Sequence, residues 1–309
     1  MRQTANELSR RDFLTVLGAL PLLSAVAGSQ QARPAAAIPI AVQLYSVRGE
    51  SKRDFDAALE QVAAMGFAGV EFAGYYNYAG RPTDLAKRLE MLKLKAAGTH
   101  IGLDTLQGDA LQKTIEFHQA IGCRFLVVPS NRDFTDPDKS KALAETFNRL
   151  AESLKPLGMA TGYHNHTGEF KQDGGRTFWD LFAERTSKDV ILQQDCGWTA
   201  AAGFDPVQYI RKYPGRARTV HFKPYAREGD TGKKAILGQD SVDWRAVYDA
   251  CASTGGTEWI VIEQETYPDG KSATECTRES LEGLKRIVRT EDSGLRTEAR
   301  AGAFLGACV

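Results

Sequence analysis

The sequence lacks several features that would place it in common functional classes. Its five cysteines, at positions 123, 196, 251, 276 and 308, are odd in number and form no CxxC pair. That pattern fits neither a disulfide framework nor a structural zinc site. Thirty-nine basic and 39 acidic residues give a formal net charge of zero, so no general attraction to nucleic acid or anionic lipid is expected. No GxGxxG loop follows the first strand-like segment, which argues against an open nucleotide-binding sheet.

The N-terminal segment is set apart from the rest by its composition. Arg10 and Arg11 precede an apolar stretch from Phe13 to Ala27, which is too short for a membrane span and is interrupted by Pro21. Small residues in "AVAG" then offer a cleavage site. We interpret residues 1–37 as a twin-arginine signal peptide and linker, with an uncleaved lipid-facing anchor as the alternative. The expected location is the periplasm, with no stable membrane insertion once the signal has been removed.

From Ile38 onward, strand-like and helix-like patterns alternate at intervals of roughly thirty residues, the length of one βα unit. This alternation predicts a single (β/α)₈ barrel over residues 38–290, followed by an irregular C-terminal tail over residues 291–309. The predicted strands are Ile40–Ser46, Gly69–Ala73, Ala97–His100, Phe125–Pro129, Met159–His166, Ile191–Asp195, Thr219–Lys223 and Trp259–Glu263.

Most of these predicted strands end in residue types that can bind metals or transfer protons. A charged side chain at the end of a buried strand is costly unless it is paired or bound to a metal. In barrel enzymes the chemistry lies at this C-terminal face. The residues concerned are Glu71, His100, His164 with His166, Asp195, His221 with Lys223, and Glu263 with Glu265.

A mixed nitrogen and oxygen ligand set is predicted from strands five to eight. His164, Asp195, His221 and Glu263 would together bind one divalent metal, and this donor set suits Mn²⁺, Zn²⁺, Co²⁺ or Fe²⁺ better than Ca²⁺ or Mg²⁺. A network of salt bridges without a metal is the alternative. Four separate strands each donating a ligand type favour the metal site.

The remaining polar residues are assigned roles from their position along the strands. Because side chains alternate along a strand, Lys223 shares the face of His221, and its ammonium could stabilise an oxyanion near the metal. Glu263, Lys223 and His166 are therefore the catalytic candidates. Four residues are predicted to contact substrate or orient a ligand, namely Glu71, His100, Trp198 and Glu265. Residues 225–242 are long enough to form a lid, and a solvated loop is the alternative.

Residues 38–289 resemble the sugar phosphate isomerases/epimerases with a xylose isomerase-like barrel. The motifs that carry the resemblance are "QLYSVR", "GVEFAGYYN", "GYHNHTGEF", "DCGWTAAAGFDPVQYI", "VHFK" and "VDWRAVYDACASTGGTEWIVIEQE". The resemblance implies a divalent metal used in proton transfer next to a carbonyl, with Asp195, His221 and Glu263 as ligands. His164 stands where many relatives have a glutamate.

This histidine changes the reaction that the resemblance implies. Epimerases of the family typically pair two glutamates as bases on the two faces of the substrate, and His164 leaves Glu263 without that partner. The expected activity is isomerisation or epimerisation of a small keto- or aldo-sugar through an enediolate. The alternative is a hydratase, dehydratase or lyase acting on 3-keto sugars or glycosides. An abasic-site endonuclease is a remote alternative, disfavoured by the neutral charge, and a barrel that only binds sugar is disfavoured by the intact ligand set. The oligomeric state stays open.

Overall fold

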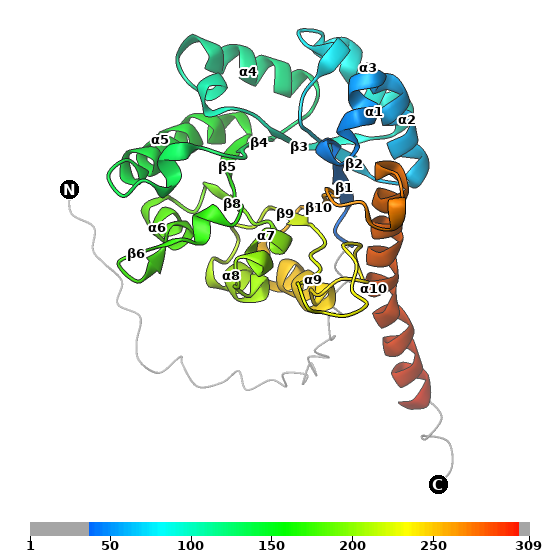
Figure 1. The fold of residues 1–309 in the computed structure, drawn as a ribbon. Coiled ribbons are helices and arrows are strands. Elements are labelled where there is room, and N and C mark those ends of the chain that lie inside the picture. The colour runs from blue at the N-terminus through cyan, green and yellow to red at the C-terminus, as the bar shows by residue number, and fades with distance from the viewer. Residues whose placement is uncertain (1–36, 303–309) are drawn as a thin grey trace, which may run out of the picture. The chain divides into compact units, whose positions relative to one another are not determined.

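Eight parallel strands form the centre of the molecule, surrounded by helices (Figure 1). The computed structural model describes the backbone of residues 37–302 and the side chains of residues 37–289, so the predicted signal peptide lies outside the described residues. The strand order is β8-β5-β4-β3-β2-β1-β10-β9. The strands are β1 Ile40–Gln43, β2 Gly69–Phe72, β3 Lys95–His100, β4 Phe125–Val128, β5 Ala160–His164, β8 Ile191–Gln193, β9 Thr219–Phe222 and β10 Trp259–Ile262.

Strands β8 and β9 are the two edge strands of this sheet, and contacts between them make it a nearly closed barrel. A parallel bridge joins Asp195 to His221 just beyond β8. The His221 N–H donates to the Gln194 carbonyl at 2.9 Å, and the Leu192 N–H donates to the Arg216 carbonyl at 2.9 Å. The predicted (β/α)₈ barrel is therefore confirmed.

The helices pack their apolar faces on the outside of the barrel. In α5, for example, Leu143, Phe147, Leu150 and Leu154 recur at helical spacing and are all buried. The helices are α1 Arg48–Arg53, α2 Phe55–Met65, α3 Pro82–Leu92, α4 Gly108–Ala120, α5 Ser140–Leu154, α6 Phe178–Arg185, α7 Cys196–Ala201, α8 Pro206–Lys212, α9 Trp244–Ala250 and α10 Ala273–Gly302. A two-stranded hairpin, β6 Gln172–Asp173 with β7 Arg176–Thr177, follows β5.

Several strands are shorter than their sequence pattern predicts, because polar side chains end them. Strand β1 was expected to reach Ser46 but ends at Gln43, whose side chain accepts a hydrogen bond from the Tyr45 N–H and starts the 3₁₀ turn Leu44–Val47. Strand β5 ends at His164 rather than His166, and the His166 N–H donates to Glu169 at 2.8 Å.

The C-terminal segment differs from the irregular tail predicted for residues 291–309. Helix α10 continues through this segment to Gly302. A helix also persists where the residues have high intrinsic helix propensity, and "RTEAR" supplies such residues. Residues 303–309 lie outside the described residues.

The barrel interior changes from apolar to polar along its axis. Ala41, Phe125, Ala160, Ile191 and Val261 fill the end near the strand N-termini, packed against Trp259. Two residues further along several strands, polar side chains occupy the same inward face. Among the described residues, none of the helices has the length and apolar character needed to cross a membrane.

We expect Gly162→Ala to destabilise the barrel, because strand β5 has no room for a side chain at this position. A Cβ on Gly162 would lie 2.1 Å from the Ile191 carbonyl oxygen of β8, and backbone cannot give way as a flexible side chain can. The free energy of unfolding should fall by about 1–3 kcal/mol. Urea denaturation measures it. Gly49→Ala, in α1 with open space around the new Cβ, is the control and should be neutral or stabilising.

Candidate metal centre and active site

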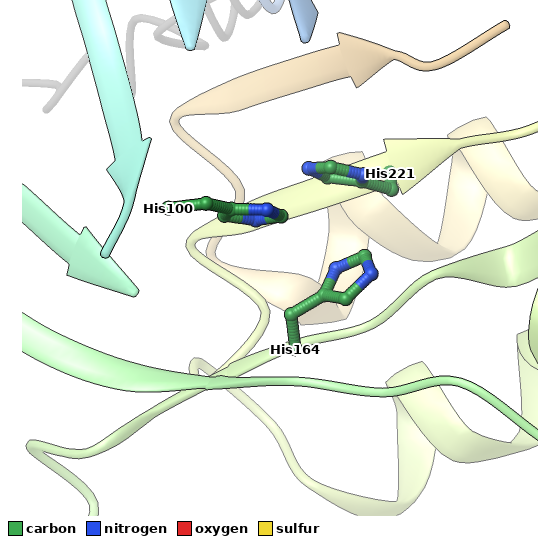
Figure 2. Close-up of side chains that lie close together, drawn as sticks. All are labelled: His100, His164 and His221. Atoms are coloured by element: carbon green, nitrogen blue, oxygen red, sulfur yellow. The ribbon is translucent and has the colours of Figure 1, made fainter. Parts of the chain in front are cut away.

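Polar side chains from several strands converge inside the C-terminal end of the barrel. His100 ends β3, His164 ends β5 and His221 lies within β9. Figure 2 shows their three rings pointing toward one another. The His164 and His221 ring centroids are 4.5 Å apart, and the His100 ring is stacked on the His221 ring at 5.1 Å. The strand ends therefore place these histidines in one cluster.

The structure brings the four predicted metal ligands together. One side-chain donor atom from each of His164, Asp195, His221 and Glu263 lies within 4.8 Å of every other. All four side chains are buried. They come from the ends of β5, β8 and β10 and from β9. This arrangement could hold a single cation among two nitrogen and two oxygen donors.

Asp195 carries an oxygen whose surroundings fit a bound cation. Its Oδ1 accepts a hydrogen bond from the Trp198 N–H at 2.8 Å at the start of α7. Its Oδ2 is buried and has no hydrogen-bond partner among the described residues. This Oδ2 lies 4.0 Å from both His164 Nε2 and His221 Nδ1. Burial raises the pKa of Asp195 to about 7, so its ionised form needs a positive neighbour here.

His221 is oriented by a second carboxylate behind it. Its Nε2 is 2.5 Å from Glu71 Oε2, and its Nδ1 faces Glu263 Oε2 at 3.0 Å. Burial opposes the charged ring, yet Glu71 and Glu263 raise the pKa of His221 to about 10. When Nε2–H donates to Glu71, Nδ1 is the atom left for a metal, which is the usual carboxylate–histidine arrangement of metal sites.

Gln193 fixes the orientation of two further histidines. Its Nε2 donates to Glu71 Oε1 at 2.7 Å and to Thr219 Oγ1 at 2.8 Å. Its Oε1 therefore faces His164 Nδ1 at 3.1 Å and His100 Nε2 at 2.6 Å. Both histidines must carry their proton on the nitrogen that donates to this oxygen. Burial, followed by the neighbouring His221, holds the pKa of His164 well below its ordinary value, so the ring is neutral and the lone pair of Nε2 is available to a metal.

Glu71 was expected to contact substrate or orient a ligand, and its contacts support the second role. It is fully buried and also accepts a hydrogen bond from Gln43 Nε2 at 2.8 Å. Burial raises its pKa, but His100 and His221 outweigh that effect and the net pKa is lowered. Gln43 and Gln193 were not singled out from the sequence. The signal available was an uncharged amide near the end of each apolar strand, in "AVQ" and "VILQQ".

A cavity of about 330 Å³ opens beside the cluster. Its lining includes Tyr45, His100, His166, Glu263 and Glu265. A larger cavity, of about 560 Å³, lies between α8 and residues 225–243 and is lined by none of the four ligand candidates. The smaller cavity is therefore the candidate active site, because a substrate there would reach the cluster.

Of the other predicted site residues, His100, His166 and Glu265 line this cavity, whereas Glu71, Lys223 and Trp198 are not part of its lining. The Lys223 ammonium contacts the Glu265 carboxylate, lies 3.9 Å from Glu263 Oε2 and stands 4.8 Å from the Trp198 ring centroid. Burial opposes ionisation of Glu263, but the hydrogen bond with His221 and the charge of Lys223 lower its pKa to about 2. The His166 ring centroid is 5.0 Å from that of His164.

Residues 225–242 form an ordered connection to α9. Asp240 accepts hydrogen bonds from the Trp244 Nε1–H at 2.7 Å and the Tyr225 N–H at 2.9 Å. Ile236 and Leu237 are buried in the protein. Gln264 Nε2 donates to the Ala235 carbonyl at 2.7 Å. The segment is thus anchored on the barrel at several points.

The chain is similar to proteins of one barrel family. Residues 59–287 match the family model described as the xylose isomerase-like TIM barrel. An inosose dehydratase from Lacticaseibacillus casei is 24% identical over 252 residues, covering 69% of this chain and 83% of that protein. An inosose dehydratase from Bacillus licheniformis is 26% identical over 252 residues, covering 68% and 81%.

Solved structures agree on the fold. A sugar phosphate isomerase/epimerase from Parabacteroides distasonis superposes with a TM-score of 0.66 at 24% identity, covering 83% of this chain and 97% of that chain. A probable 3-DHS dehydratase from Bacillus anthracis superposes with a TM-score of 0.61 at 12% identity, covering 80% and 99%. With eight parallel strands and a family match across most of the barrel, this chain belongs to the xylose isomerase-like TIM-barrel family.

Proposed function

We propose that the protein is a metal-dependent enzyme that removes a proton next to the carbonyl of a small keto sugar and then eliminates an oxygen substituent from the adjacent carbon. The reaction class is that of a dehydratase or lyase. The names of the inosose dehydratases from Lacticaseibacillus casei and Bacillus licheniformis support elimination. The mixed donor set of the cluster supports metal dependence, with Mn²⁺, Zn²⁺, Co²⁺ or Fe²⁺ as the candidates.

The state of His164 is the observation that favours elimination over the epimerisation expected from the sequence. Exchange of a proton between the two faces of one carbon requires two groups able to accept it. Neither His164 nitrogen would be open to a substrate proton once a metal is bound, since Nδ1 donates to Gln193 Oε1 and Nε2 would be a metal ligand. Glu263, the carboxylate of the cluster that lines the cavity, is then left as the base. One base is sufficient for an elimination.

Each residue at the metal centre and the cavity has a separate role in the proposed reaction. A divalent metal held by His164, Asp195, His221 and Glu263 would polarise the substrate carbonyl. The ionised Glu263 accepts the proton from the neighbouring carbon. The charge of Lys223 favours the ionised form of Glu263, and its ammonium contacts the Glu265 carboxylate. His166 lines the same cavity just beyond the end of β5, which is separated from β10 and Glu263 by β8 and β9, and supplies a proton to the departing oxygen.

The export signal predicted over residues 1–37 limits the classes of sugar that the enzyme would meet. Phosphorylated sugars are scarce outside the cytoplasm, so we propose that a periplasmic enzyme acts on an uncharged keto sugar or keto glycoside. Glu263 and Glu265 at the cavity wall suit hydroxyl groups, which donate hydrogen bonds to carboxylates.

Glu263→Gln is expected to abolish turnover and to weaken metal binding, because an amide cannot accept the proton and is a poorer ligand. The measurement is NMR of a panel of keto sugars in D₂O, with metal content determined on the same samples. With the wild-type enzyme, the substrate should lose a hydroxyl or a glycosidic substituent. Glu258→Gln, at the opposite end of β10, should behave as the wild type.

Two results would contradict this assignment. Full activity of Glu263→Gln would remove Glu263 from the chemistry. Exchange of a carbon-bound proton by the wild type, with every hydroxyl retained, would show isomerisation instead of elimination.

Metal affinity is expected to rise with pH between pH 6 and pH 8. In the metal-free protein the raised pKa of Asp195, about 7, and of His221, about 10, mean that both hold protons at the lower end of this range. A metal must displace these protons, so lowering the pH weakens binding by roughly tenfold per pH unit for each proton released. Calorimetric titration with Zn²⁺ in two buffers of different ionisation enthalpy counts the protons. Binding without proton release would refute the prediction.

Replacement of Arg10 and Arg11 by lysine is expected to leave the full-length precursor in the cytoplasm. The twin-arginine pathway reads this pair, and lysine keeps the charge but not the recognised side chain. Cell fractionation with an antibody to the barrel distinguishes precursor from mature protein. Unchanged export of the double variant would point to a different route.

A further inference from the structure

An exposed aromatic ring stands at the rim of the active-site cavity. Tyr45 follows β1 in the 3₁₀ turn Leu44–Val47 and lines the cavity together with Glu265. Its side chain is 44% exposed, and among the described residues it is the aromatic that stands out as large and exposed. The Tyr45 ring takes no part in the proposed steps at the metal centre.

The ring is held in place from one side. The Arg48 guanidinium lies 4.5 Å from the Tyr45 ring centroid. Arg48 Nη1 also donates to the Tyr45 carbonyl at 3.1 Å and to the Tyr267 hydroxyl oxygen at 3.0 Å. The Tyr267 hydroxyl in turn donates to the Ser46 carbonyl at 3.0 Å. A ring fixed in this way loses little conformational freedom when a ligand stacks on it.

The position of Tyr45 is also tied to the metal centre. Its backbone N–H donates to Gln43 Oε1 at 3.1 Å, and the Nε2 of the same amide donates to Glu71 Oε2 at 2.8 Å. Glu71 is the carboxylate that orients His221. The backbone of Tyr45 is therefore linked to the metal centre through two hydrogen bonds of the Gln43 amide.

The cavity is small for a substrate larger than one sugar ring. Its volume of about 330 Å³ lies at the lower end of the range for small-molecule sites. A second ring of a larger substrate would have to lie at the rim, where Tyr45 offers an aromatic face and Glu265, 28% exposed, offers a hydrogen-bond acceptor. Sugar rings present C–H faces that pack on aromatic rings, while their hydroxyls donate to carboxylates.

We propose that Tyr45 forms the subsite for the leaving group, and that the substrate is a keto glycoside carrying a second sugar ring. This inference rests on the proposed elimination. The C–H bond next to the ketone breaks, a carbon–carbon double bond forms, and the glycosidic C–O bond breaks. The departing oxygen takes up a proton, so the products are an unsaturated keto sugar and an alcohol. No oxidant or reductant is consumed.

The test measures binding separately from turnover. The probes are cellobiose and methyl β-glucoside, which lack the ketone, titrated against the full-length protein loaded with Zn²⁺ and followed by saturation-transfer NMR. We expect magnetisation transfer to both rings of cellobiose. Tyr45→Ala and Tyr45→Leu should raise the Kd for cellobiose about fivefold to tenfold, the size of one aromatic contact. Tyr45→Trp keeps an aromatic face and should stay within about twofold of the wild type.

Tyr248→Ala is the matched control. Tyr248 also has an arginine, Arg245, near its ring at 5.7 Å, but it lies in α9 and does not line the cavity. Its cellobiose affinity should equal that of the wild type, and thermal melts check that each variant is folded. Equal cellobiose affinity in the wild type, Tyr45→Ala and Tyr45→Leu would overturn the subsite, as would transfer confined to one ring. Because the probes do not react, these outcomes are independent of whether elimination is the reaction.

Discussion

The contact between Glu71 and His221 is the interaction on which the rest of the site depends. Both side chains are fully buried, and a buried charge without a partner would be very costly. The pair meets this cost by forming a charged hydrogen bond, and Gln43 and Gln193 satisfy the remaining carboxylate lone pairs. Because Glu71 accepts through both oxygens, it determines which way the Gln193 amide points. That amide then sets the protonated nitrogen of His164 and His100.

This dependence explains why the polar layer sits where it does in the barrel. The strands deliver Ala41, Ile191 and Val261 to one level of the interior and Gln43, Gln193 and Glu263 to the next, since each pair is two residues apart. The lower level is apolar and closed by Trp259. It gives the upper level an apolar floor, on which hydrogen bonds are stronger than they would be in water. The geometry of the ligands is thus a property of the barrel rather than of its loops.

Much of the fold and the clustering of the candidate ligands could be predicted from the sequence, for the same physical reason. Alternation along a strand follows from backbone geometry, so the parity of His221 with Lys223 and the repeat of βα units indicate a common face without knowledge of contacts. What periodicity does not encode is the partner of each side chain. Strand β1 ends early because the Gln43 side chain accepts a hydrogen bond from the Tyr45 N–H. Lys223 contacts the Glu265 carboxylate. Both contacts depend on side-chain rotamers, which the periodicity of the sequence does not determine. Helix α10 extends past residue 290 through local propensity, a weaker signal than apolar spacing.

The unpartnered oxygen of Asp195 links the stability of the barrel to its chemistry. Asp195 forms the bridge to His221 at the β8–β9 junction and caps α7, so its backbone helps to close the barrel while its Oδ2 stays unpaired in the interior. Any cation that binds the folded cluster and not the unfolded chain stabilises the fold in proportion to the logarithm of its concentration over Kd. The strand junction that completes the barrel is then also the place where a ligand acts on folding. A cation held by Asp195 and His221 would therefore stabilise the strand junction at which the barrel closes.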